Sequence, residues 1–420
     1  MKERARKIIK HPLISGSIVV SAGSLLANFI NFFFNIFLSR NLAVQDYGTI
    51  ASLIAIINLF GISAGAINPT IVNFTGQKFL NKDFSYIRGI YIKVLKPILL
   101  IGLIILLFFV FFNLIISNFL NIANNSILIS LTGAIISLSF LGVLNMALFQ
   151  AKLSFNIFSS LNVLSSSIKL IFSTLFLYLG FGPVGVMVAI FISYAIPYFS
   201  GFYFLKFLFK GEVSKVKIDF FEILKYAAPS GAALLALTAI NSTDLILVKH
   251  IFDPDIAGIY AGLSLIGKVI FFFTAPIGIV MFPILARKHN NNENPGRTIH
   301  LSIGLVLASS LSITVFYFLF PEFVISLFLK NSAYLVVAPY LGFFGLFISL
   351  YSLCSVMMYY FLSIKKTWIY KPILAVALLQ AVLIYLFHAT FGVIIFISTS
   401  LTLVLLIYLL SYYFFLNKKK

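Results

Sequence analysis

The chain has 420 residues, of which 61% are hydrophobic and only 10% are charged, and its mean hydropathy is +1.08. Soluble domains carry about 25% charged residues, so this composition excludes a soluble globular protein and indicates a polytopic membrane protein. The single cysteine, Cys354, excludes a disulfide framework and a multi-cysteine metal site. We therefore expect no metal site, and we expect Cys354 to be a small buried hydrophobic residue.

Apolar segments of about 20 residues, the length of a bilayer span, recur along the whole chain. The basic start MKERARKIIKHP precedes a segment that is too long for a signal-peptide core and lacks an A-x-A cleavage pattern, which predicts a retained first span. The longest connection, residues 209–226, is predicted to be an amphipathic helix on the membrane surface. The twelve predicted spans cover residues 14–38, 48–71, 94–116, 127–149, 157–180, 184–208, 227–248, 257–284, 299–320, 334–362, 368–388 and 391–415.

The net charge of +19, from 30 Lys and Arg against 11 Asp and Glu, would suggest a nucleic-acid partner in a soluble protein. Here most basic residues lie between spans, which indicates that they determine the orientation of the spans and contact anionic lipids. We therefore expect no nucleic-acid partner. With a cytoplasmic N-terminus, 25 of the 30 fall on the cytoplasmic side. Three fall on the other side (Arg40, Lys249 and Lys330) and two deep inside spans (Lys169 and Lys268). This bias predicts that both termini are cytoplasmic.

Polar residues of the first span lie on one helical face. They are Ser17, Ser21, Ser24, Asn28, Asn31 and Asn35, spaced 4, 3, 4, 3 and 4, which places them within an arc of about 80°. An amide that faced lipid would cost several kcal/mol, so this face must contact protein or water. It is either a packing seam against another helix or the wall of a hydrated cavity. Three asparagines favour the cavity, because seams are typically built from Gly, Ala and Ser.

The fifth span repeats this pattern with a charge, through Asn162, Ser166, Lys169 and Ser173. Lys169 and Lys268 both lie near the middle of a span, where each costs about 2.5–3.5 kcal/mol. Such residues normally face a cavity or pair with an acid. One acid alone lies inside a predicted span, Asp244, which shares a face with Thr238 and Asn241. One acid cannot neutralise two lysines, and this predicts a surplus of positive charge.

Two interpretations of Asp244 remain open. It either forms an ion pair with Lys268 on the neighbouring span or responds to a proton or Na⁺, because burial raises the pKa of a carboxyl group.

The chain contains an internal repeat near its midpoint. LSRNLAVQDYGTIASLI (38–54) and VKHIFDPDIAGIYAGLSLI (248–266) each give a basic residue, an Asp and then a Gly, with one extra residue in the second. LYLGFGPVGVMVAIFISY (177–194) likewise echoes LIYLFHATFGVIIFISTS (383–400). Six spans per half keep both halves in the same orientation, which predicts a parallel repeat about an axis normal to the membrane, with a site between the halves. We expect lobes at residues 1–210 and 211–420.

These linkers resemble a known family. LAVQDYGTIASLIAI is similar to the first inter-span loop of the Wzx-type polysaccharide-biosynthesis flippases, and LKYAAPSGAALLALTAINSTDLILVKHIFDPDIAGIYAGLSL, followed later by FPILARKH, is similar to their seventh and eighth spans. That family belongs to the multidrug/oligosaccharidyl-lipid/polysaccharide (MOP) exporter superfamily. The resemblance implies an all-α polytopic membrane protein with about 12 transmembrane helices in two six-helix lobes around a central cavity. It also implies a flippase that moves an undecaprenyl-pyrophosphate-linked oligosaccharide, such as an O-antigen repeat unit, across the cytoplasmic (inner) membrane by alternating access.

For such a substrate, lysines and arginines are expected to bind the pyrophosphate and amides the sugar hydroxyls. Asp244 is the candidate ion-coupling residue, and no cofactor is expected. Further candidate partners are membrane lipids and the polysaccharide polymerase and chain-length machinery. The pyrophosphate candidates are Lys169, Lys268, Lys249 and, more weakly, Arg40, which is also suited to anchoring an outer loop; the sugar candidates are Asn28, Asn31, Asn35, Asn162 and Asn241.

Other classes of protein remain as alternatives. An ion-coupled multidrug or small-molecule exporter of the same superfamily would favour an acidic cavity, and a flippase for the peptidoglycan lipid precursor typically has two further spans. A membrane glycan polymerase or ligase would need a large outer loop, whereas the outer loops here are short. The sequence has no nucleotide-binding or nucleophile motif, so we expect that the protein is not an enzyme. An ion gradient and downstream consumption of the substrate both remain possible energy sources for transport.

Overall fold

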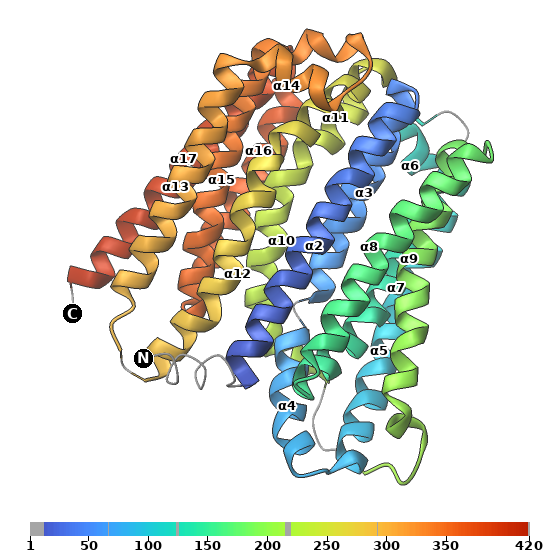
Figure 1. Ribbon diagram of the computed structural model, residues 1–420, viewed down its shortest axis with the longest axis vertical. Helices are drawn as coiled ribbons and strands as arrows, with labels where there is room; N and C mark the ends of the chain where they lie inside the picture. The colour runs from blue at the N-terminus through green and yellow to red at the C-terminus, as the bar shows by residue number, and fades with distance from the viewer. Residues whose placement is uncertain (1–11, 66, 123–125, 215–219, 292, 419–420) are drawn as a thin grey trace. The chain divides into compact units, whose positions relative to one another are not determined.

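The computed structural model describes residues 12–65, 67–122, 126–214, 220–291 and 293–418 (Figure 1). These residues form α-helices and short 3-10 helices, and no strand occurs among them. Twelve helices are long and apolar enough to cross a membrane, and each overlaps one of the twelve predicted spans. The predicted fold class, an all-α polytopic membrane protein, is therefore confirmed.

Contacts divide the chain into two compact units. Unit 1 consists of Met1–Phe34, Phe60–Phe119 and Ala123–Gly231, and unit 2 consists of Asn35–Leu59, Leu120–Ile122 and Ala232–Lys420. Two short segments of the first half of the chain thus belong to the unit that contains most of the second half. The division into lobes at residue 210 stays a prediction.

Unit 1 is built around one central helix, α7. This helix packs against α4, α5 and α9, and α8 packs against α9. The helix α2 (Pro12–Asn41) belongs to this unit up to Phe34. The other helices of the unit are α4 (Asn68–Leu80), α5 (Phe84–Phe111), α6 (Asn113–Phe119), α7 (Ser126–Ala151), α8 (Phe155–Tyr178), α9 (Gly182–Phe204) and the short η1 (Lys206–Phe209).

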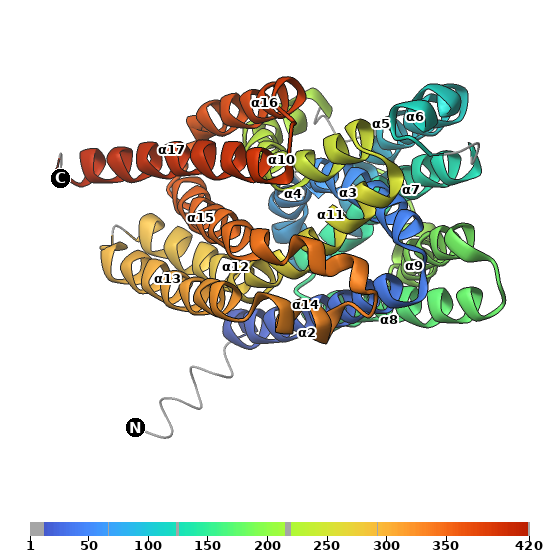
Figure 2. The same ribbon diagram turned by 90° about the horizontal axis from the view of Figure 1, so that it is seen from above.

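Unit 2 has α15 (Ala338–Ser363) at its centre, in contact with α12, α13 and α17 (Figures 1 and 2). Hydroxyl groups join it to two of them, since Thr274 donates to Ser352 at 2.9 Å and Thr314 lies 2.9 Å from Ser349. Cys354 is fully buried here, as expected. Two helices belong to this unit only in part, α3 (Val44–Gly65) up to Leu59 and α10 (Phe220–Ile251) from Ala232. The other helices are α11 (Pro254–Gly267), α12 (Val269–Asn290), α13 (Gly296–Leu319), α14 (Pro321–Phe328), η2 (Ser332–Val337), η3 (Thr367–Ile369), α16 (Tyr370–Leu386) and α17 (Phe391–Lys418).

The predicted eighth span consists of two helices, because α11 ends at Gly267 and α12 begins at Val269. Gly267 lies so close to the ring of Phe344 that a Cβ atom there would collide with it. Glycine also lowers local helix stability. The hydroxyl of Tyr317 donates to the carbonyl of Ile266 at 2.7 Å and so satisfies a carbonyl at the break. Lys268 therefore lies at a junction between two helices.

The connection after α9 differs from the predicted amphipathic helix. Residues 210–214 are not helical, and residues 215–219 lie outside the described part of the chain. The buried Arg88 side chain donates to the carbonyls of Phe207, at 3.0 Å, and Glu212. Gly211, with φ +94°, packs against its guanidinium group. Tertiary hydrogen bonds to these carbonyls thus hold this stretch in an irregular conformation.

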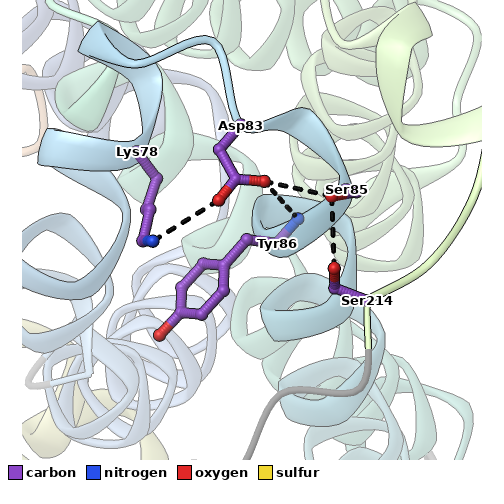
Figure 3. A network of polar contacts seen from close by, with 5 residues as sticks. All are labelled: Lys78, Asp83, Ser85, Tyr86 and Ser214. Atoms are coloured by element: carbon purple, nitrogen blue, oxygen red, sulfur yellow. Dashed lines mark hydrogen bonds and ion pairs between the residues drawn. The ribbon is translucent and has the colours of Figure 1, made fainter.

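The third span begins ten residues earlier than predicted, because Asp83 caps α5. The Asp83 carboxylate accepts from the backbone N–H of Tyr86 at 3.2 Å and from Ser85 at 3.0 Å (Figure 3). Lys78 forms an ion pair with it at 3.4 Å, and Ser85 in turn contacts Ser214. The hydrogen bond from Tyr86 is the largest cause that lowers the pKa of Asp83; those from Ser85 and Lys78 add to it.

We predict that Asp83→Ala lowers the thermal stability of the purified protein, because α5 loses its cap. The folded-state pKa is lowered, so the stabilising effect is present above the unfolded pKa of about 4 and is lost as the pH falls through the folded pKa. Melting curves in detergent should therefore differ between wild type and variant at pH 7 and converge in acid. Equal curves at pH 7 would contradict the role of the cap.

Candidate functional site

The polar face of the first span contacts the fifth span within unit 1. Asn31 donates to the hydroxyl of Ser166 at 3.2 Å, and Ser159 donates to the carbonyl of Val19 at 3.0 Å. Gly23 approaches Ser159 so closely that a Cβ atom on Gly23 would lie 2.7 Å from the Cβ atom of Ser159. This part of α2 is therefore a packing seam against α8, one of the two interpretations of the polar stripe.

Other amides of the two stripes have different surroundings. Asn162 donates to the carbonyl of Phe158 in its own helix at 3.1 Å. Asn28 is partly exposed, and no described residue forms a hydrogen bond with its side chain. Asn35 belongs to unit 2 and is partly exposed. The seam and an open polar face thus occur on the same helix.

Lys169 lies on α8 one turn after Ser166, on the face that contacts α2. Its ammonium group lies 5.0 Å from the ring centroid of the buried Phe34, a cation–π contact. No described residue forms a hydrogen bond or an ion pair with Lys169. The structure therefore places a partly buried positive charge in unit 1 without a neutralising carboxylate.

Asp244 is completely buried in unit 2 and makes one hydrogen bond. Its Oδ2 atom accepts from the hydroxyl of Tyr260 at 2.9 Å, and its Oδ1 atom has no donor among the described residues. Asp244 interacts with Lys268 electrostatically, but no direct ion pair within 4.0 Å joins them among the described residues. Of the two interpretations of Asp244, the ion pair is thus not formed in this structure.

Two buried amide oxygens of unit 2 also have no donor among the described residues. One is the Oδ1 atom of Asn241, one turn earlier on α10, and the other is the Oε1 atom of Gln380 on α16. The amide nitrogen of Gln380 donates to the carbonyl of Ile240 at 3.1 Å and to Ser398 at 3.0 Å. The amide of Gln380 is therefore held next to the backbone of α10 immediately before Asn241.

The remaining basic candidates also lie in unit 2. Lys249 is only 1% exposed and interacts electrostatically with Asp46 and Asp255. Arg40 donates to the carbonyls of Leu327 and Phe328 at the end of α14. Their pyrophosphate roles stay predictions, and in this structure both side chains have protein partners.

Sequence reasoning missed Tyr260 and Gln380. Gln380 could have been found by the argument applied to the asparagines, because it is a single amide within the apolar segment ALLQAVLIY. Tyr260 could not, because tyrosines are frequent in this chain and only the tertiary structure shows its bond to Asp244. The described residues contain no group of three His, Cys, Asp or Glu side chains that could hold a metal ion.

Comparisons with known proteins support a transporter fold. The inward-facing conformation of a multidrug resistance MATE family transporter of the MOP superfamily matches with a TM-score of 0.73 and 14% identity, over 96% of this chain and 99% of that chain. The lipid II flippase MurJ in its inward closed conformation matches with a TM-score of 0.75 and 16% identity, over 94% of this chain and 87% of that chain. No curated protein sequence matches this chain significantly.

A sequence model of the family described as "Polysaccharide biosynthesis protein" matches residues 37–339. This region covers most of the chain and contains both linkers that carry the resemblance. The chain therefore belongs to the polysaccharide biosynthesis protein family, and it has the fold of the MOP-superfamily transporters.

Proposed function

We propose that this protein is a flippase that moves an undecaprenyl-pyrophosphate-linked oligosaccharide, such as a surface-polysaccharide repeat unit, across the cytoplasmic membrane by alternating access. Membership of the polysaccharide biosynthesis family supports the class of cargo. The observation that carries the proposal is Lys169, a lysine within a span that no described acid neutralises. A buried cation of this kind is costly unless a negative group binds to it, and a pyrophosphate supplies that group.

The other parts of the proposal follow from this cargo. Lys268, at the junction of α11 and α12, is the second candidate for the pyrophosphate, because among the described residues no direct ion pair joins it to Asp244, whose carboxylate accepts from Tyr260. Open amides such as Asn28 suit the uncharged sugar hydroxyls. Both termini would be cytoplasmic, and the polymerase and chain-length machinery would receive the product. The proposed cycle contains no chemical step, so the protein would act as a transporter and not as an enzyme.

An ion gradient is the proposed source of energy. Asp244, Asn241 and Gln380 each present a buried oxygen that has no donor among the described residues. Such oxygens cost about 1–3 kcal/mol each when nothing binds them. A proton or Na⁺ bound at the carboxylate would remove that cost at Asp244, and ionisable residues within spans typically mark proton and ion pathways. The buried carboxylate also supports the alternative function, an exporter of cationic compounds, but its bond to Tyr260 favours the small ion.

We predict that Lys169→Ala and Lys268→Ala each reduce export of the lipid-linked oligosaccharide. A hydrogen bond to a charged group contributes about 1.5–3 kcal/mol, so export should fall by about tenfold or more. Flipping would be measured in proteoliposomes, with membrane levels checked by immunoblotting. The matched control is Lys330→Ala, an exposed lysine, which should export normally. Normal export by both test variants would exclude a cationic site for the cargo.

We predict that Asp244→Asn makes export less dependent on the pH and Na⁺ gradients, because the amide cannot take up a proton or a net charge. Rates would be compared in proteoliposomes with each gradient imposed separately. Glu322→Gln, which removes an exposed acid of α14, should keep the wild-type dependence. If Asp244→Asn kept it too, Asp244 would not be the coupling residue.

We predict that a cysteine at Asn28 reacts with a membrane-impermeant thiol reagent faster than a cysteine at Asn31. The reason is that Asn28 has no protein partner among the described residues, whereas Asn31 packs against Ser166. Replacing the single buried Cys354 with Ala gives the background for both variants. Equal protection of the two positions would show that the whole stripe is a packing seam.

A further inference from the structure

A short helix follows the third span of each half of the chain, with one residue between the span and the short helix. In unit 1, α5 ends at Phe111 and α6 begins at Asn113; in unit 2, α13 ends at Leu319 and α14 begins at Pro321 (Figure 1). The two short helices are separated in sequence by nearly the same distance as the two similar linkers. The third and ninth spans are an even number of spans apart, so both short helices lie at the same side of the membrane.

The short helix α14 has a buried face and an exposed face. Its buried face packs against α15 and η2 within unit 2. On the exposed face Phe323 and Leu327, one helical turn apart, are 59% and 52% exposed. Glu322 and Ser326 are also exposed, and they form a polar row beside the apolar one. The surroundings of α14 therefore meet an apolar row and a polar row side by side.

The short helix α6 repeats this arrangement in unit 1. Ile115 and Phe119, one turn apart, are 64% and 41% exposed, and Asn118 is exposed beside them. Counted from the end of the preceding span, these two apolar residues and this polar residue take the same places as those of α14. The exposed Leu114 stands where α14 has Glu322, which widens the apolar row of α6. The inner side of α6 packs against α7.

The apolar rows continue the apolar surfaces that the preceding spans expose. Exposed Leu, Ile, Val and Phe side chains run along α5 and α13 as far as Phe111 and Leu319. From the last Lys or Arg of each span, Lys96 in α5 and Arg297 in α13, the helix rises about 22 Å and about 33 Å to these residues. The long stem of a lysine adds several Å by snorkelling. The hydrocarbon core is about 30 Å thick, so both short helices lie near its boundary.

We propose that α6 and α14 are interfacial helices, which insert their apolar rows into one leaflet of the membrane and anchor each unit separately at that boundary. A helix with an apolar row beside a polar one lies in the plane of the interface, with its apolar side chains among the upper acyl groups. Asn118, Glu322 and Ser326 then meet headgroups and water. A protein partner would have to match two surfaces on different units, whereas lipid covers both because each continues a span that faces lipid.

The depth of each helix can be measured with a tryptophan reporter and brominated lipids. The chain has one tryptophan, so Trp368→Phe gives a background without tryptophan emission. Ile115→Trp or Phe323→Trp is added to it, and the protein is placed in nanodiscs that hold one copy each. Bromines near the headgroup end of the acyl chain should quench both reporters at least twofold more strongly than bromines near the chain end. The measurement requires no transport, so its outcome is independent of the proposed function.

Two control reporters calibrate the measurement. Leu103→Trp lies at an exposed position in the middle of α5 and should be quenched most by the deep bromines. Glu293→Trp lies in the exposed connection between α12 and α13 and should be quenched by acrylamide and not by either lipid. Phe119→Trp and Leu327→Trp, one turn after the first reporters, test the same rows if a first variant does not fold.

Three results would overturn the proposal. Quenching of the α6 and α14 reporters by acrylamide alone would show that both helices project into water. Protection from acrylamide and from both lipids would show that protein covers the apolar rows. Stronger quenching by the deep bromines than by the shallow ones would place the helices inside the hydrocarbon core. A shallow position for one helix alone would overturn the pairing of the two anchors.

Discussion

The absence of water in the bilayer core is the constraint on which the rest of this structure depends. A polar side chain within a span must find a partner inside the protein or face an aqueous space. Within unit 1, Asn31 finds Ser166, and within unit 2, Thr274 finds Ser352 and Asp244 finds Tyr260. The polar groups that remain after this pairing are few. They are the residues from which a function can be argued.

Polar groups without a partner among the described residues occur in both units. In unit 1, Lys169 lies over the face of Phe34 without a hydrogen bond or ion pair, and buried oxygens of Asn68 and Ser173 have no donor. In unit 2, Lys268 has no direct ion pair, and buried oxygens of Asp244, Asn241 and Gln380 have no donor. A positive charge suits an anionic cargo, and buried oxygens suit a small cation.

The number of spans could be predicted from the sequence, because the length of an apolar segment is a local property that the bilayer thickness sets. The break at Lys268 could not, because it depends on the ring of Phe344, which lies far away in the sequence, against Gly267. The irregular stretch after α9 depends in the same way on Arg88. Spacing predicts that the polar stripe of the first span lies on one face of a helix. Spacing cannot tell whether that face meets a helix or water, because the neighbouring helix is not known from the sequence.

The internal repeat shows why similar sequences need not have similar roles. Gly48 in α3 and Gly258 in α11 touch, since a Cβ atom on Gly48 would lie 2.7 Å from the Cα atom of Gly258, so both positions require a residue without a side chain. The surroundings of Arg40 and Lys249 differ, because the arginine binds carbonyls at the end of α14, whereas the lysine interacts with Asp46 and Asp255. The two similar linkers thus share a close backbone contact but not the charges around it. Similar sequences can in this way keep one backbone contact while each acquires its own polar chemistry.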